Sequence, residues 1–227
     1  MTDPRPPITD WAAWEDRFAA FLDAQMADSD AAHDRAHIER VVRTARRLAA
    51  EADARLEVVL PAAWLHDCVV LPKDHPERDQ AAARAAATAR RFLDEADYPE
   101  SWHDAIAHAI AAHSYSGDVA PDTVEAAVVQ DADRLDALGA VGLARCFMVG
   151  GALDHALYHP DDPFCNTRPP DDDTYTVDHI YEKLLDLPAT MQTEAGRAEA
   201  ERRVQFMQTY LSQLEDEIGS APGPSEG

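Results

Sequence analysis

The stretch Pro61-Ala-Ala-Trp-Leu-His-Asp-Cys-Val-Val70 is an apolar run that carries an imidazole and a carboxylate side by side, His66 and Asp67. Small and apolar residues recur through it at helical spacing, which predicts a helix over 57–69 with His66 on its buried face. A buried histidine beside a carboxylate is costly unless both groups have partners. A metal ion is the strongest available partner, because neutral imidazole and carboxylate both bind metals.

The His-Asp dipeptide alone does not establish a site. With 10 His and 28 Asp in 227 residues, about one such pair is expected by chance, and the chain has three. In His33-Asp34 the aspartate is most simply a helix cap, and His103-Asp104 is expected to face solvent. Only His66-Asp67 lies in a strongly apolar run, so its meaning depends on the segments before and after it.

Composition favours helix throughout the chain, because alanine is abundant while β-branched and aromatic residues are sparse. A length of 227 residues can bury one sizeable core. We therefore expect an all-α, single-domain fold. Its parts are a first segment with one helix (1–30), a core (31–153), a long loop with C-terminal helices packing on that core (154–218) and a disordered tail (219–227).

Apolar stripes, caps and breakers predict the individual helices. The expected spans are 10–27, 34–54, 57–69, 79–95, 100–113, 122–138, a continuation to 153, 174–187 and 193–218. The Pro-rich, acidic segment 154–172 between them is a long loop whose role the sequence leaves open.

The chain is strongly acidic, with 43 Asp and Glu against 20 Lys and Arg and a net charge of -23. A phosphate backbone needs basic patches, so long nucleic acid is not an expected partner. An acidic, lysine-poor surface is typical of proteins from a high-salt host, and a GC-rich genome would also replace lysine with arginine. Both explanations stay open.

Targeting signals are not evident from the sequence. No apolar run approaches the roughly 18 residues that a membrane span needs. The N-terminal stretch has neither the basic nor the apolar region of a signal peptide. Three widely spaced cysteines favour a reducing compartment over a disulfide framework, so we expect a cytoplasmic protein.

Three segments together resemble a known pattern. His37-Ile-Glu-Arg-Val41, His66-Asp67 and Ala132-Asp133-Arg134-Leu135 are similar to the H…HD…D pattern of the HD-domain metal-dependent phosphohydrolase superfamily. The stretches around 66–78, 112–114, 130–139 and 179–185 resemble the branch that includes bacterial nucleoside triphosphate pyrophosphohydrolases. The resemblance covers nearly all of the chain after residue 30.

The resemblance implies an HD-type helical bundle with the metal site between central helices. It implies one divalent metal ion (Mn, Mg, Fe, Ni or Zn) held by His37, His66, Asp67 and Asp133, a mixed nitrogen and oxygen set that suits these ions. The last ligand is open on the residues alone. The apolar stripe of the helix at 122–138 favours Asp131, whereas the family pattern favours Asp133, which we choose.

Substrate-binding residues are expected close to this site. Lys73 and Arg78 follow His66-Asp67 in the chain, and an anionic protein that binds a phosphate needs such local positive charge. His113 lies on an apolar helix face near the site by family analogy, where it could bind a phosphate or protonate a leaving group. The alternative for Lys73 and Arg78 is that they are ordinary surface charges. The alternative for His113 is a core histidine whose hydrogen bonds are satisfied within the protein. With His66 and Asp67, Lys73 and His113 form the predicted catalytic set.

The function that these features predict is metal-dependent hydrolysis of a nucleotide, in particular nucleoside triphosphate (pyro)phosphohydrolysis by a metal-activated water. A phosphomonoesterase or a signalling-nucleotide hydrolase is the alternative within enzymes. Two-iron oxygenase chemistry would need a further ligand such as His108 or His113. A metal-stabilised binding protein without turnover is the alternative of another class. The expected partner is a small phosphorylated substrate such as a nucleotide. We expect no membrane partner, and the chain should be a monomer or a homodimer.

Overall fold

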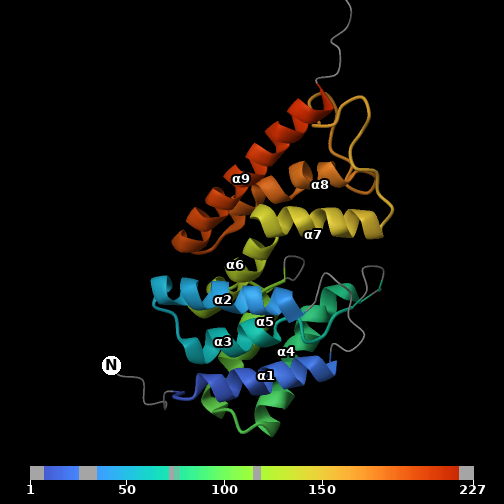
Figure 1. Ribbon diagram of the computed structural model, residues 1–227. Helices are drawn as coiled ribbons and strands as arrows, with labels where there is room; N and C mark the ends of the chain where they lie inside the picture. Colours follow the sequence, from blue (N-terminus) through green and yellow to red (C-terminus); the bar gives the residue numbers. More distant parts are fainter. Residues whose placement is uncertain (1–7, 26–34, 72–74, 76, 115–118, 220–227) are drawn as a thin grey trace, which may run out of the picture. The chain divides into compact units, whose positions relative to one another are not determined.

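The structure, a computed structural model, describes residues 8–25, 35–71, 75, 77–114 and 119–219. Within these residues the chain forms nine α-helices and three short 3-10 helices, and it contains no β-strand (Figure 1). One isolated parallel bridge joins Ala156 and Tyr175. The prediction of an all-α fold is confirmed.

The helices lie close to their predicted spans. They are α1 (Trp11–Gln25), α2 (Arg35–Ala52), α3 (Leu56–Leu65), α4 (Ala81–Glu95), α5 (His103–Ala112), α6 (Val124–Asp136), α7 (Gly139–Ala152), α8 (Thr176–Glu182) and α9 (Glu194–Ile218). The 3-10 helices are η1 (Arg78–Gln80), η2 (Glu100–Trp102) and η3 (Leu184–Thr190). The helix predicted over 174–187 is therefore interrupted: α8 ends at Glu182, and η3 takes up the chain at Leu184.

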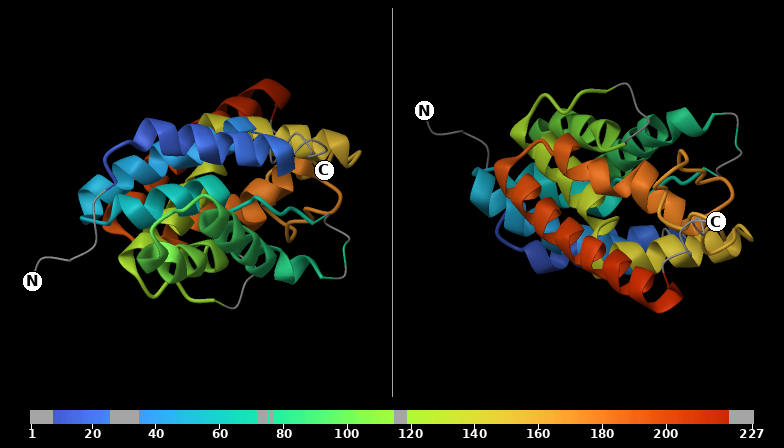
Figure 2. Two further views of the ribbon diagram at one scale, coloured as in Figure 1. Left: turned by 90° about the horizontal axis from the view of Figure 1, so that it is seen from below. Right: turned by 90° about the horizontal axis from the view of Figure 1, so that it is seen from above.

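The chain divides into two compact units, residues 1–133 and 134–227, with the boundary inside α6. In the first unit α3 is the central helix. All eight residues from Val58 to Leu65 are buried. The sequence predicted one buried face, but α3 is apolar on every side. Other helices must therefore pack around its whole circumference. Helices α1, α2, α4 and α5 supply that cover, and α4 runs along α5 (Figure 2).

Helix α3 is shorter than predicted, because it ends at Leu65 rather than near Val69. The carbonyl oxygen of Ala63, which a longer helix would offer to the amide of Asp67, accepts a hydrogen bond from His66 Nδ1 at 2.9 Å. The amide of Cys68 closes a tighter turn on the carbonyl of Leu65 at 3.1 Å. His66 and Asp67 therefore lie in a turn at the end of a buried helix.

The second unit is built from α7, α8, η3 and α9. Helix α7 packs against α8 and α9, and η3 also packs against both α8 and α9. Gly139 begins α7 with a φ of 73°, a left-handed conformation that favours glycine. Gly150 allows α7 to approach α8, because a Cβ atom there would lie 2.2 Å from Thr176 Oγ1. The loop between α7 and α8 is tied down by Arg168, whose guanidinium pairs with the buried carboxylate of Asp178.

Among the described residues, no single helix is long and apolar enough to cross a membrane. Helices α6 and α7 meet the length and composition criteria only when they are counted together as a bent pair.

Candidate metal centre

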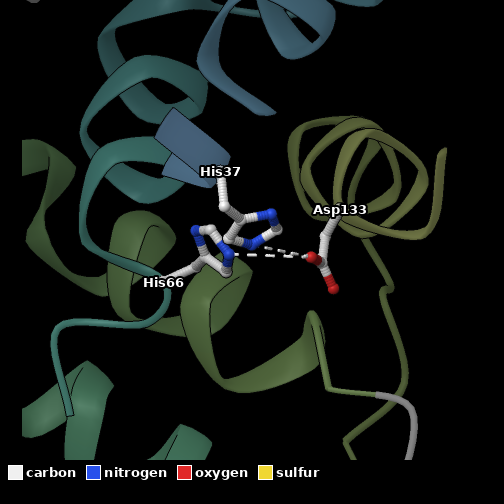
Figure 3. Close-up of side chains that lie close together, drawn as sticks. All are labelled: His37, His66 and Asp133. Atoms are coloured by element: carbon white, nitrogen blue, oxygen red, sulfur yellow. Dashed lines mark ion pairs between the residues drawn. The ribbon is translucent and has the colours of Figure 1, made fainter. Parts of the chain in front are cut away.

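Three histidines and two aspartates of the first unit converge on one point. His37 comes from α2 and Asp133 from α6, while His66 and Asp67 follow α3 and His113 follows α5. In Figure 3 the rings of His37 and His66 both point toward the carboxylate of Asp133. The helices thus bring together residues that are up to about a hundred positions apart in the sequence.

The distances form two groups that share His66. Oδ1 of Asp133 lies 3.5 Å from His37 Nε2 and 3.7 Å from His66 Nε2. Oδ2 of Asp67 lies 3.7 Å from His66 Nε2 and 3.9 Å from His37 Nε2, and its Oδ1 lies 3.4 Å from His113 Nε2. Within each group, one potential ligand atom per residue lies within 4.8 Å of the others.

Main-chain hydrogen bonds set which ring nitrogen of His66 and His113 faces the carboxylates. His66 Nδ1 donates to the carbonyl of Ala63 at 2.9 Å, and His113 Nδ1 donates to the carbonyl of Ile110 at 2.6 Å. A carbonyl only accepts, so each Nδ1 carries the hydrogen and a neutral ring has a bare Nε2. When the rings are neutral, both Nε2 atoms point a lone pair at carboxylate oxygens, an arrangement that a cation stabilises.

The most telling atom is His66 Nε2. His66 is fully buried, and among the described residues no atom forms a hydrogen bond with this nitrogen. A buried polar atom without a partner is costly, so it indicates a missing binding partner. Ligands that each lie about 2.1 Å from one ion are about 3–4 Å apart, which matches the distances between His66 and the two carboxylates.

Electrostatics agree with this geometry. Burial alone would lower the pKa of His66, but the negative charges of Asp67 and Asp133 outweigh it and raise that pKa to about 9. Burial would raise the pKa of Asp133, but its contact with His66 lowers the pKa to about 2. Without a metal, the site compensates its carboxylates by holding a proton on His66.

The site opens on its carboxylate side. The side chains of Asp67 and Asp133 are 20% and 28% exposed, whereas His37, His66 and His113 are buried. A ligand therefore reaches the centre past the two carboxylates. Because an anionic ligand meets negative charge there, a cation has to be present for it to bind.

The other predicted residues are placed as follows. Asp131 is fully buried in α6, whereas Asp133 faces the histidines. Arg78 donates to the carbonyl of Leu71 at 3.1 Å, and within the described residues it forms no hydrogen bond or ion pair with the five convergent side chains. Lys73 lies outside the described residues.

One expectation about a histidine is wrong. His103 does not face solvent: it is buried, with Nε2 2.9 Å from the carbonyl of Tyr98 and Nδ1 3.0 Å from Asp94. Asp104 beside it is exposed and pairs with Arg90. A histidine at the start of a helix can turn back to the preceding loop, and helical periodicity does not reveal this.

Sequence reasoning singled out no role for Gln130. It lies on α6 one turn before Asp133 and donates from Nε2 to the carbonyl of Ala112, next to His113, at 2.7 Å. The signal that could have found it is its spacing, because positions i and i+3 share one helix face.

Comparison with known proteins gives consistent matches over this region and beyond. The family model of the HD domain matches residues 35–138, which include all five convergent residues. The chain is similar to the protein YpgQ of Bacillus subtilis, with 31% identity over 207 residues that cover 89% of this chain and 93% of YpgQ.

Solved structures show the same likeness. The crystal structure of Bacillus subtilis YpgQ in complex with ADP superimposes with a TM-score of 0.68 at 31% identity, covering 91% of this chain and 95% of that one. The crystal structure of an HD-superfamily hydrolase from Bacillus thuringiensis superimposes with a TM-score of 0.71 at 31% identity, covering 93% and 100%.

Proposed function

Because the chain belongs to the HD-domain family of metal-dependent phosphohydrolases, we propose that it hydrolyses nucleotides with the help of one divalent metal ion. The observation that carries the proposal is Nε2 of His66, which is buried between two carboxylates at 3.7 Å and has no hydrogen bond within the described residues. His37, His66, Asp67 and Asp133 are the proposed ligands, with Mn, Mg, Fe, Ni or Zn as the candidate ions.

Each side chain has a distinct task in this proposal. The ion, when bound, activates a water molecule as nucleophile and compensates charge on the phosphoryl group. His113 touches Asp67 and is buried beside the open side of the site, where its Nε2 can bind a phosphate oxygen or hold a proton for the leaving group. Lys73 and Arg78 are proposed to bind the phosphate groups of the substrate.

A nucleoside triphosphate is the proposed substrate, cleaved by water to a nucleoside monophosphate and pyrophosphate. The ADP complex of YpgQ, which is 31% identical to this chain, supports a nucleotide ligand. A phosphomonoesterase or a signalling-nucleotide hydrolase would use the same ligands and differ in the substrate pocket. A binding protein would keep the ligands and lack turnover.

Product analysis tests these readings. Metal-loaded protein is incubated with nucleoside tri-, di- and monophosphates, and orthophosphate and pyrophosphate are measured separately. We expect pyrophosphate and monophosphate from triphosphates, with activity lost in His66→Ala. The matched control is His103→Gln, which changes an equally buried histidine outside the centre. Orthophosphate as the only product points to a phosphatase, and no turnover of any nucleotide refutes the enzymatic proposal.

A further inference from the structure

Gln130 is a buried polar residue of α6 whose side chain bonds to the backbone next to His113. The residue is 3% exposed, and its Nε2 donates to the carbonyl of Ala112 at 2.7 Å. Ala112 is the last residue of α5, where carbonyls lack partners within the helix. Gln130 therefore supplies a donor to a buried carbonyl that α5 itself leaves without one.

The partner fixes the orientation of the Gln130 amide. A carbonyl only accepts, so Nε2 rather than Oε1 must face Ala112. Within the described residues Oε1 is buried and has no hydrogen-bond partner. A buried polar atom without a partner is unfavourable for stability, so the presence of this glutamine calls for another explanation. What its donor holds in place provides one.

Two hydrogen bonds hold His113. The carbonyl bound by Gln130 belongs to the peptide that joins Ala112 to His113, so this bond fixes the backbone from which the imidazole projects. At the ring, Nδ1 of His113 donates to the carbonyl of Ile110 at 2.6 Å. With backbone and ring both held, Nε2 of His113 faces Oδ1 of Asp67 at 3.4 Å. Loss of either bond would allow the imidazole to turn away from Asp67.

Gln130 also links this histidine to the helix that carries Asp133. Positions i and i+3 share a helix face, so Gln130 and Asp133 lie on the same side of α6. Near its start, α6 is tied to the same unit by Glu125, which accepts from the amide of Arg55 at 3.3 Å. That bond is about two turns from Asp133, whereas Gln130 is one turn away. The bond from Gln130 therefore joins the end of α5 to the part of α6 that carries a proposed ligand.

We infer that Gln130 is a positioning residue for His113. The inference rests on the proposed function, in which His113 binds a phosphate oxygen or holds a proton for the leaving group. Gln130 acts through His113, by keeping its Nε2 beside Asp67, and not on the substrate itself. Displacing a reacting group by about 1 Å can cost about 100-fold in rate. Loss of one of the two bonds that hold His113 should therefore be measurable.

Gln130→Leu tests the inference, because leucine is also buried readily and has no hydrogen-bonding group in its side chain. The change leaves the Ala112 carbonyl without its donor but also removes the buried unpaired oxygen, so the fold should be retained. In the metal-free protein at a fixed pH, we expect the imidazole NMR signals of His113 to shift while those of His103 do not. The metal dissociation constant should stay unchanged, because His113 is not a proposed ligand.

Tyr98→Phe is the matched control. Tyr98 is buried in the same unit, and its hydroxyl donates to the carbonyl of Glu57, also at 2.7 Å. The variant thus deletes a side-chain donor to a backbone carbonyl, but outside the five convergent residues. The rings of Tyr98 and His103 are stacked with centroids 6.4 Å apart. We therefore expect Tyr98→Phe to shift the signals of His103 and to leave those of His113 in place.

Kinetics provide a second readout. In Gln130→Leu the kcat for the nucleotide should fall about tenfold, with KM little changed. In a His113→Ala background the same substitution should have no further effect, because residues that act through one group are not additive. A further loss of about tenfold in that background would show that Gln130 acts by another route, and the inference would be wrong.

The NMR readout keeps this inference separate from the proposed function. A wild type that turns over no nucleotide refutes the function, and the His113 signals still decide the role of Gln130. Unshifted His113 signals in Gln130→Leu overturn the inference whatever the activity. Weakened metal binding in that variant overturns it too, because Gln130 would then position the ligands. If the leucine variant does not fold, Gln130→Met, which keeps the length of the side chain and lacks the donor, must shift the same signals.

Discussion

Metal binding should compete with a proton on His66. In the metal-free site the pKa of His66 is raised to about 9, because the charges of Asp67 and Asp133 outweigh the effect of burial. A metal needs the neutral ring, so the proton must leave when the ion binds. At pH 7, about two units below that pKa, the proton should weaken the apparent affinity about 100-fold. The affinity should then rise about tenfold for each pH unit and level off above about pH 9.

Isothermal titration with Mn²⁺ between pH 7 and 9 measures this effect directly. Repeating the titration in buffers with different ionisation enthalpies counts the protons released, and we expect about one per ion at pH 7 and none well above pH 9. The control protein His103→Gln should give the same curve. An affinity that is flat between pH 7 and 8, with no proton release, would refute the argument that the two carboxylates hold a proton on His66.

Four further outcomes are expected. A raised His66 pKa stabilises the metal-free protein fully below its unfolded value of 6.5, so the melting temperature in chelator should fall as pH rises from 6.5 toward 9. Asp133→Ala should lose metal in elemental analysis while Asp131→Ala retains it; the opposite result would make Asp131 the ligand. Lys73→Ala should keep its metal but lose about 10–1,000-fold in kcat/KM. If the variant hydrolyses nucleotides at the wild-type rate, Lys73 does not bind the substrate phosphates. The melting temperature should rise between low and molar KCl because salt screens the charge of -23, whereas a flat or falling value would count against a high-salt adaptation.

The helices were predictable because their signals are local. Asp10, for example, directly precedes α1 and caps it, with Oδ1 accepting from the amide of Ala13 at 3.0 Å. The end of α3 was not predictable, because apolar residues continue to Val70. At this end, the side chain of His66 forms a hydrogen bond with the carbonyl of Ala63, which hydropathy does not describe.

The sequence indicated candidate residues for the site but not the distances between them. Burial favoured Asp131 as the last ligand, and Asp131 is indeed the more buried of the two carboxylates. The structure instead turns Asp133, which is partly exposed, toward His37 and His66. A group that binds both an ion and the solvent beside it needs some exposure, so burial alone does not decide between the two carboxylates. The bond from Gln130 to Ala112 depends on how α5 and α6 meet, which a linear sequence does not encode locally.

Burial of α3 on every side has a consequence for exchange kinetics. Amides that are buried and hydrogen-bonded throughout a central helix exchange with deuterium only when a large part of the fold opens. The non-proline amides from Val59 to Leu65 should therefore be among the slowest in the first unit. The carboxylates of Asp67 and Asp133, in contrast, touch solvent in the closed fold. We therefore expect an ion at the proposed centre to exchange with solvent without the large opening that releases an α3 amide proton.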